Sequence, residues 1–142
     1  MTDLLLSDPA QLGELFADPW LRQPKPRDRI AAAVRDATRS ARDFADLQRR
    51  LRGVRRREML RLGAREIGWG TTEEVARELS ALADACIAAA LGFCHEELAR
   101  SYGEPIGLDE RTAFVVLGMG KLGGEELNFC SDVDLLYLYA SD

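Results

Sequence analysis

Two apolar runs near the end of the chain are joined by the stretch Gly118-Met119-Gly120-Lys121-Leu122-Gly123-Gly124. The run before it, Phe114-Val115-Val116-Leu117, is continuously apolar, as is typical of a buried strand. The run after it, from Asp132 to Tyr139, predicts a second strand. The sequence therefore predicts neighbouring strands over residues 113–119 and 132–139, with a glycine-rich turn after the first.

The second predicted strand begins with two carboxylates, Asp132 and Asp134. Successive side chains on a strand point to opposite faces, so these two share a face, with Cα atoms roughly 6.5–7 Å apart. Mg²⁺ takes one or two carboxylates together with water and phosphate oxygens, so this pair can bind it. Paired aspartates at a strand start are also frequently solvated or capping residues, and the pair alone does not define a metal site.

The glycine-rich turn strengthens the hypothesis of a metal and phosphate site. Gly123 and Gly124 let backbone N–H groups approach an anion at the N-terminus of a short helix, predicted over residues 125–129. Ser131 adds a hydroxyl beside the carboxylates. This order of strand, paired glycines, short helix and Asp-x-Asp is the layout of the nucleotidyltransferase fold shared with polymerase beta, where metals polarise the reacting phosphoryl group.

Two other phosphate-binding motifs use glycines in a similar way. The spacing Gly118-x-Gly120-x-x-Gly123 formally matches the dinucleotide fingerprint. That motif needs a full helix and an acidic residue about 20 positions on, where Leu138 stands. A P-loop needs Gly-Lys followed by Ser or Thr, whereas Lys121 is followed by Leu122. Both alternatives fit less well than the nucleotidyltransferase layout.

The chain before this region predicts an α-helical bundle. Apolar residues recur at three- and four-residue steps from Asp28 to about Arg52, where Gly53 is expected to break or kink the helix. A second helix is expected to end at Gly68-Trp69-Gly70. Upstream, short helical turns are expected behind Asp8-Pro9 and Asp18-Pro19, with each aspartate as a cap.

The longest helix is expected over residues 71–102. Thr71-x-x-Glu74 is a capping box, and Gly103 with Pro105 ends the pattern. One apolar stripe runs along this helix and contains Val75, Leu79, Leu82, Cys86, Ala89 or Ala90, Phe93 and Leu98.

Composition narrows the class of protein. With 46% hydrophobic and 30% charged residues, the chain has the balance of a soluble globular protein. It shows neither a secretory signal nor an apolar run near the ~18 residues of a membrane span, so we expect a cytoplasmic protein with no membrane contact. The odd number of cysteines (Cys86, Cys94 and Cys130) without Cys-x-x-Cys spacing predicts reduced thiols, and the lone His95 cannot build a metal site.

Charge is spread unevenly. Net charge is −5, yet residues 21–65 hold 15 Lys and Arg against 5 Asp and Glu. Such a block can meet nucleic acid or an acidic protein. No aromatic residue lies between Arg49 and Arg65, which argues against base stacking. We therefore expect a solvated helical face and no nucleic-acid partner.

The segment GMGKLGGEELNFCSDVDLLYLY, residues 118–139, resembles almost residue for residue the signature of the bacterial glutamine synthetase adenylyltransferase/deadenylylase family. The resemblance continues upstream through VRRREMLRLGAREI and TTEEVARELSALADACIAAAL and covers about residues 47–140. It implies two nucleotidyltransferase domains in the whole protein. The first removes AMP from a tyrosine of glutamine synthetase by phosphorolysis, giving ADP, and the second attaches AMP from ATP. The form Glu126-Leu127-Asn128-Phe129 resembles the first domain, so we expect the deadenylylase half.

The resemblance also implies roles for residues of this chain. Mg²⁺ would be held by Asp132 and Asp134. Phosphate would be contacted by Gly123, Gly124 and Ser131, with Lys121 as a further candidate. A further metal-binding carboxylate would come from a later strand. The implied partners are glutamine synthetase, ATP or ADP, phosphate, and a PII-type nitrogen-signalling protein that acts through other regions.

Together these features predict an α+β chain in three segments. Residues 1–27 form a variable N-terminal segment, 28–106 a helical region, and 107–142 the start of an incomplete nucleotidyltransferase domain. We expect such a fragment to be inactive alone. Two alternatives remain open: a non-catalytic interaction remnant, and a stand-alone nucleotidyltransferase acting on another substrate.

Overall fold

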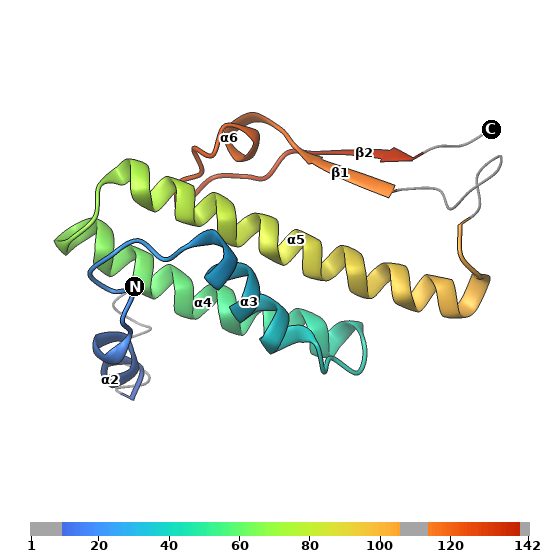
Figure 1. The fold of residues 1–142 in the computed structure, drawn as a ribbon, viewed down its shortest axis with the longest axis horizontal. Helices are drawn as coiled ribbons and strands as arrows, with labels where there is room; N and C mark the ends of the chain where they lie inside the picture. The colour runs from blue at the N-terminus through green and yellow to red at the C-terminus, as the bar shows by residue number, and fades with distance from the viewer. Residues whose placement is uncertain (1–9, 106–113, 140–142) are drawn as a thin grey trace.

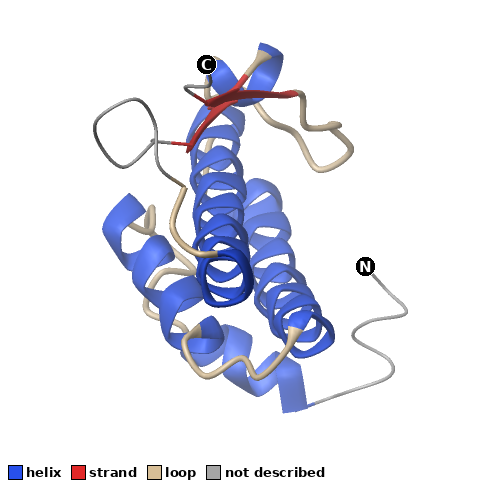
Figure 2. Cartoon of the chain, turned by 90° about the vertical axis from the view of Figure 1, so that its right-hand side faces the viewer, coloured by secondary structure: helices blue, strands red, loops and turns tan. Residues whose placement is uncertain are grey.

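The structure, a computed structural model, describes residues 10–105 and 114–139. It is mostly helical with one small antiparallel sheet, which agrees with the expected α+β class. The longest helix, α5, lies between α3 and α4 on one side and the strands with α6 on the other (Figures 1 and 2). The elements in chain order are α2 (Ala10–Ala17), α3 (Arg27–Thr38), α4 (Phe44–Gly68), α5 (Thr72–Tyr102), β1 (Phe114–Gly118), α6 (Gly120–Gly123) and β2 (Leu135–Tyr139).

Both ends of α5 form as the sequence predicts. The Thr71 hydroxyl accepts a hydrogen bond from the Glu74 N–H at 3.2 Å, and the Glu74 carboxylate accepts one from the Thr71 N–H at 3.3 Å. This reciprocal pair is the expected capping box. At the other end Gly103 has φ 87°, a conformation that favours glycine, and the helix stops there. Local chemistry thus sets the bounds of the longest helix.

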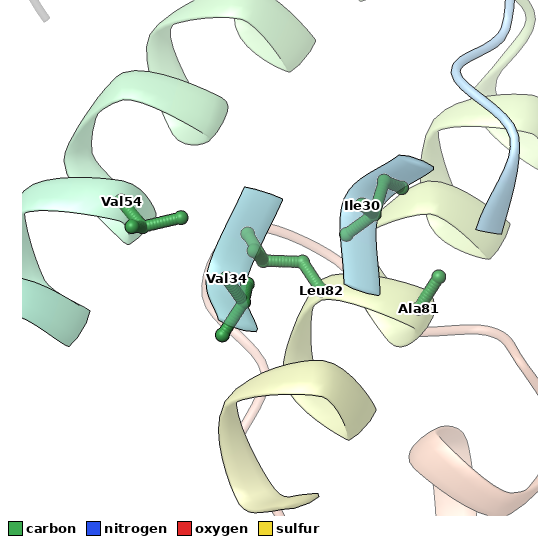
Figure 3. Packing of buried hydrophobic residues seen from close by; sticks show 5 residues of the cluster. All are labelled: Ile30, Val34, Val54, Ala81 and Leu82. Carbon is green, nitrogen blue, oxygen red and sulfur yellow. The ribbon is translucent and has the colours of Figure 1, made fainter. Parts of the chain in front are cut away.

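The core of the helical region lies where α3, α4 and α5 meet (Figure 3). It is a cluster of five buried side chains: Ile30, Val34, Val54, Ala81 and Leu82. Cys86 packs against this cluster, and burial raises the pKa of its thiol. The predicted stripe on α5 is confirmed from Val75 through Ala89, because Cys86 and Ala89 also pack on this cluster, whereas Leu98 near the end is 58% exposed. The stripe therefore drives packing along the helix up to about Ala89.

The break between the first two bundle helices was predicted at the wrong place. It falls between α3 and α4, where Asp43 caps the new helix by accepting the Asp46 N–H at 2.7 Å. Gly53 lies inside α4 without interrupting it, and a Cβ there would meet nothing within 4 Å. An exposed glycine costs a helix only about 1 kcal/mol, too little to break one that is packed on neighbours.

The N-terminal segment also differs from its prediction at one of two positions. Asp8-Pro9 lies outside the described residues. At Asp18-Pro19 the chain turns instead of starting a helix, because the Asp18 carboxylate accepts the Trp20 N–H at 2.8 Å. The turn brings Leu21 onto Leu15 of α2 and Leu60 of α4.

Two arginines of the basic block are buried, which the charge pattern did not predict. Arg61 is 1% exposed and binds Glu58 at 2.8 Å and Glu78 at 2.6 Å. Arg65 is fully buried, with its Nε 3.1 Å from Glu78. Burial alone would raise the pKa of Glu58, but the Arg61 charge and a hydrogen bond from Lys25 outweigh it and hold that pKa below its ordinary value. Through Lys25, this network ties the segment just before α3 to α4 and α5.

The strands pair as predicted but are not buried in the described structure. β1 and β2 are antiparallel, with Val116 opposite Tyr137. Phe114 and Leu117 of β1 are 45% and 41% exposed, and Leu136 of β2 is 46% exposed. The expectation of a buried first strand was therefore wrong for this part of the chain, because the two-stranded sheet has little packed against it.

The expectation that no run approaches the length of a membrane span was wrong for α5. By length and composition alone this helix is apolar enough to cross a membrane. A stretch of 18 residues within it has a mean hydropathy of 1.3, and 28% of that stretch is buried. The core helix of a soluble protein passes the same test, so the finding is weak evidence for a span. Within α5, Asp84 pairs with Arg27, and the first half packs on α3 and α4.

Candidate functional site

The glycine-rich turn folds into a single helical turn of its own. This turn, α6, spans Gly120–Gly123, whereas the short helix was predicted over residues 125–129, where the structure has no helix. α6 ends in a Schellman arrangement. The Glu126 N–H donates to the Lys121 carbonyl at 2.7 Å, and the Glu125 N–H donates to the Leu122 carbonyl at 3.1 Å.

The shift of the helix changes the role of two backbone amides. The Gly123 N–H donates to the Met119 carbonyl at 3.2 Å, and the Gly124 N–H donates to the Gly120 carbonyl at 3.0 Å. Both residues therefore lie at the C-terminal end of α6 and not at a helix N-terminus. These amides are therefore not the free N–H groups of a helix N-terminus. The assignment of Gly123 and Gly124 as phosphate contacts stays a prediction, which rests on their exposure and their lack of a side chain.

Close packing explains why glycines stand in this turn. A Cβ on Gly123 would lie 2.6 Å from the Gly118 carbonyl oxygen, closer than real Cβ contacts come. A Cβ on Gly118 would lie 2.8 Å from the Leu122 side chain. Gly120 has φ 53°, in the left-handed region that favours glycine. These glycines let β1 and α6 fold tightly against each other.

One predicted metal ligand lies directly beside this turn. The Met119 N–H donates to the Asp134 carbonyl at 2.9 Å, which continues the pairing of the two strands by one step. The Asp134 Oδ2 lies 3.3 Å from where a Cβ on Gly120 would be. The structure thus brings the Asp134 carboxylate and the glycine turn together, as the sequence hypothesis requires.

The position of the two carboxylates on a regular strand was predicted wrongly. β2 begins at Leu135, so Asp132 and Asp134 lie in the segment just before it. Both are exposed. The argument from alternating strand faces therefore does not fix their relative direction, and their shared role in binding a metal stays a prediction.

The remaining predicted contacts surround the same segment. The Ser131 hydroxyl accepts the Asn128 N–H at 3.0 Å, and the Asn128 side-chain oxygen accepts the Cys130 N–H at 3.0 Å. These bonds close a tight turn before Asp132. Lys121 is exposed on α6.

The helical bundle anchors this site through residues that sequence reasoning did not single out. Leu122 and Leu127 are 4% and 5% exposed and pack on Leu62, Val75 and Leu79. The Ser80 hydroxyl, fully buried on α5, accepts the Leu127 N–H at 3.3 Å. α6 accordingly sits along the N-terminal half of α5 (Figure 1). The sequence signal for this anchor is weak, because Ser80 is a single small polar residue beside the apolar stripe of α5.

The chemistry of the donors suits a hard cation, but the set is incomplete. Carboxylate oxygens of Asp132 and Asp134 are the ligands that Mg²⁺ prefers, and both are reachable from solvent. Among residues 10–105 and 114–139, no group of three His, Cys, Asp or Glu side chains could hold a metal ion. The two carboxylates would need ligands from phosphate, water or another part of the protein.

A separate cleft lies away from this site. It has a volume of about 710 Å³ and opens between α3 and the C-terminal half of α5, with Arg35, Phe93 and Arg100 among its lining residues. No residue of the glycine turn or of the carboxylate segment lines it. The candidate site lies on the exposed surface, since Gly123, Gly124, Asp132 and Asp134 are all exposed.

Comparison with known proteins shows the family of this chain. The sequence model of the family described as glutamate-ammonia ligase adenylyltransferase matches residues 1–142. The chain therefore belongs to that family.

Curated relatives carry the name bifunctional glutamine synthetase adenylyltransferase/adenylyl-removing enzyme. The relative from Thioalkalivibrio sulfidiphilus is 43% identical over 135 residues, which is 94% of this chain and 14% of the relative. The relative from Pseudomonas aeruginosa is 39% identical over 135 residues, covering 93% of this chain and 14% of the relative. The relative from Nitrosococcus oceani is 47% identical over 92 residues. The chain thus spans about one-seventh of the length of the first two.

Proposed function

We propose that this chain forms part of an enzyme that removes AMP from a tyrosine of glutamine synthetase by phosphorolysis, giving ADP. A second nucleotidyltransferase domain of the same protein attaches AMP from ATP. The observation that carries the proposal is that the Asp134 carboxylate lies beside the glycine turn, with Oδ2 3.3 Å from where a Cβ on Gly120 would be. The chain that holds this arrangement belongs to the family named above. The form of residues 126–129 favours the removing half over the attaching half.

The reaction needs one phosphorus–oxygen bond to form and one to break. An oxygen of inorganic phosphate attacks the phosphorus of the tyrosine-bound AMP, and the bond from that phosphorus to the tyrosine oxygen breaks. The tyrosine oxygen takes up a proton, and the products are ADP and glutamine synthetase with an unmodified tyrosine side chain. Catalysis of such transfers rests mainly on positioning and on stabilising charge.

The residues of this chain supply parts of that positioning. Asp132 and Asp134 would hold Mg²⁺, which supplies positive charge at the reacting phosphoryl group. Gly123, Gly124 and Ser131 would lie against phosphate, and the exposed Lys121 would place its ammonium charge beside it. The tight packing of α6 on β1 keeps these groups in a fixed relation to Asp134.

Other parts of the proposal follow from the share of the protein that this chain represents. A complete metal site and a platform for glutamine synthetase would come from the remaining length of the enzyme, so the chain alone is expected to have no turnover. The PII-type signalling protein would act through those other regions. We place the enzyme in the cytoplasm, where glutamine metabolism occurs, without nucleic acid or membrane as a partner.

The test is Asp134→Asn in the complete enzyme. It keeps the shape of the side chain but removes a hard anionic ligand, so AMP release should fall by about 10²–10³ or more, as for other lost electrostatic stabilisers. Attachment of AMP should be largely spared. Glu66→Gln, which changes an exposed carboxylate on α4, is the control and should leave both activities intact. Loss of attachment with release intact would exclude the removing half, and no change in either would exclude the metal site.

A further inference from the structure

Glu125, directly after the paired glycines, has an unusual backbone conformation. Its φ is 58°, and it is the only non-glycine residue with positive φ among residues 10–105 and 114–139. It occupies the position of the Schellman arrangement where glycine is usual. A side chain in this conformation is strained, whereas glycine adopts it freely. What Glu125 adds at this position is therefore its carboxylate.

That carboxylate is bound by an arginine from the helical bundle. Arg27 Nη1 lies 2.6 Å from Glu125 Oε1, although 98 positions separate the two residues in the sequence. The other terminal nitrogen of Arg27 binds Asp84 of α5. Arg27 is the first residue of α3, so one guanidinium joins the start of α3, the middle of α5 and the end of the glycine turn.

The link acts on the end of α6, next to the residues of the candidate site. Glu125 closes α6, and its neighbour Glu126 donates its N–H to the Lys121 carbonyl. If Glu125 left the left-handed region, both Schellman bonds would be lost. Only the bonds from the Gly123 and Gly124 N–H groups would then hold the end of α6, so Lys121 and Gly124 would be less firmly fixed relative to Asp134. The Ser80 anchor holds Leu127, two positions after Glu125, and makes no hydrogen bond with Glu125 itself.

We propose that Arg27 and Glu125 are a positioning pair, which holds the end of the glycine turn in its strained conformation and thereby sets where phosphate is bound. That this turn binds phosphate rests on the proposed function. That the Arg27–Glu125 pair holds the conformation of the turn does not. Arg27 touches no reacting group in this role and acts only through Glu125. The pair makes placement of the phosphate-binding turn depend on the helical bundle.

The test is a double-mutant cycle in the complete enzyme with Arg27→Gln, Glu125→Gln and the double variant. Each single change should raise the KM for phosphate about two- to fivefold, the range expected for a half-exposed ion pair. The KM for adenylylated glutamine synthetase should not change, and the double variant should lose no more than either single one. Arg27→Lys should restore part of the loss. Arg29→Gln, at an exposed arginine of the same helix, is the control and should change neither constant.

Urea unfolding gives a second result that does not need activity. In the Arg27→Gln background, Glu125→Gly should raise the unfolding midpoint, because it relieves strain with no ion pair left to lose. In the wild-type background the same change should raise it less or lower it. Equal shifts in both backgrounds, or additive effects on the KM for phosphate, would overturn the positioning pair. If the complete enzyme releases no AMP, the proposed function fails while the unfolding data still decide this inference.

Discussion

Replacing Gly123 by alanine should destabilise the protein, whereas the same change at the neighbouring Gly124 should not. The new Cβ would lie 2.6 Å from the Gly118 carbonyl oxygen, a backbone atom that cannot turn aside as a side chain can. β1 and α6 must then move apart by several tenths of an ångström. Overpacking of this kind costs about 1–3 kcal/mol, and the better helix propensity of alanine returns up to about 1 kcal/mol. We expect a net loss of about 1–2 kcal/mol.

Gly124→Ala is the matched control for that change. Gly124 has φ −84° and ψ −1°, which any residue adopts, and a Cβ there would lie 3.6 Å from its nearest neighbour. Alanine should therefore be neutral or stabilise the protein by up to about 1 kcal/mol. Urea unfolding followed by circular dichroism measures both variants. Equal stability of the two, or a Gly123→Ala protein as stable as the wild type, would refute the close approach of α6 to β1.

Three further predictions concern the helical bundle and the sheet. A hydrogen bond from Arg50 lowers the pKa of Asp46 from 3.8 to about 2. The Asp46 carboxylate should therefore contribute fully to stability above about pH 4, and this contribution should be lost as the pH falls towards 2. The acid-unfolding curve of Asp46→Asn should lack this loss, and a curve unchanged from the wild type would contradict the ion pair. Arg61→Met should lower the free energy of unfolding in urea by about 3–5 kcal/mol, because it leaves the buried Glu58 and Glu78 without the Arg61 guanidinium. An unchanged free energy of unfolding would contradict the buried ion-pair network. The 142-residue chain should be marginally stable or self-associate through its exposed sheet, which analytical ultracentrifugation checks, and a monomer with a sharp cooperative melt would count against this.

The longest helix was predictable because its signals are local. The capping box at Thr71, the glycine at position 103 and the apolar spacing between them each act over one or two helical turns. The break before α4 was missed for a related reason. The cap at Asp43 is as local as the one at Thr71, but Gly53 gave a more conspicuous signal that packing overrides in this helix.

The proximity of Asp134 to the glycine turn was predictable from the sequence, but the local geometry was not. The sequence placed Asp134 near the glycine turn, and the structure agrees. It did not place the helical turn on the glycines themselves, because glycine is a poor helix former and only packing against β1 and the bundle favours that conformation. Contacts such as those of Arg27 with Glu125, or of Ser80 with Leu127, join residues far apart in the chain. Periodicity and composition do not report such pairings.

The most direct measurement of the central claim uses labelled inorganic phosphate. Adenylylated glutamine synthetase is incubated with the complete enzyme, magnesium and labelled phosphate, and the nucleotide product is separated and counted. Phosphorolysis predicts that the label appears in ADP, in amounts equal to the AMP lost from the tyrosine. The Asp134→Asn enzyme should form labelled ADP about 10²–10³-fold or more slowly. Release of unlabelled AMP would show hydrolysis instead, and labelled ADP formed equally well by the Asp134→Asn enzyme would contradict the assignment of the site.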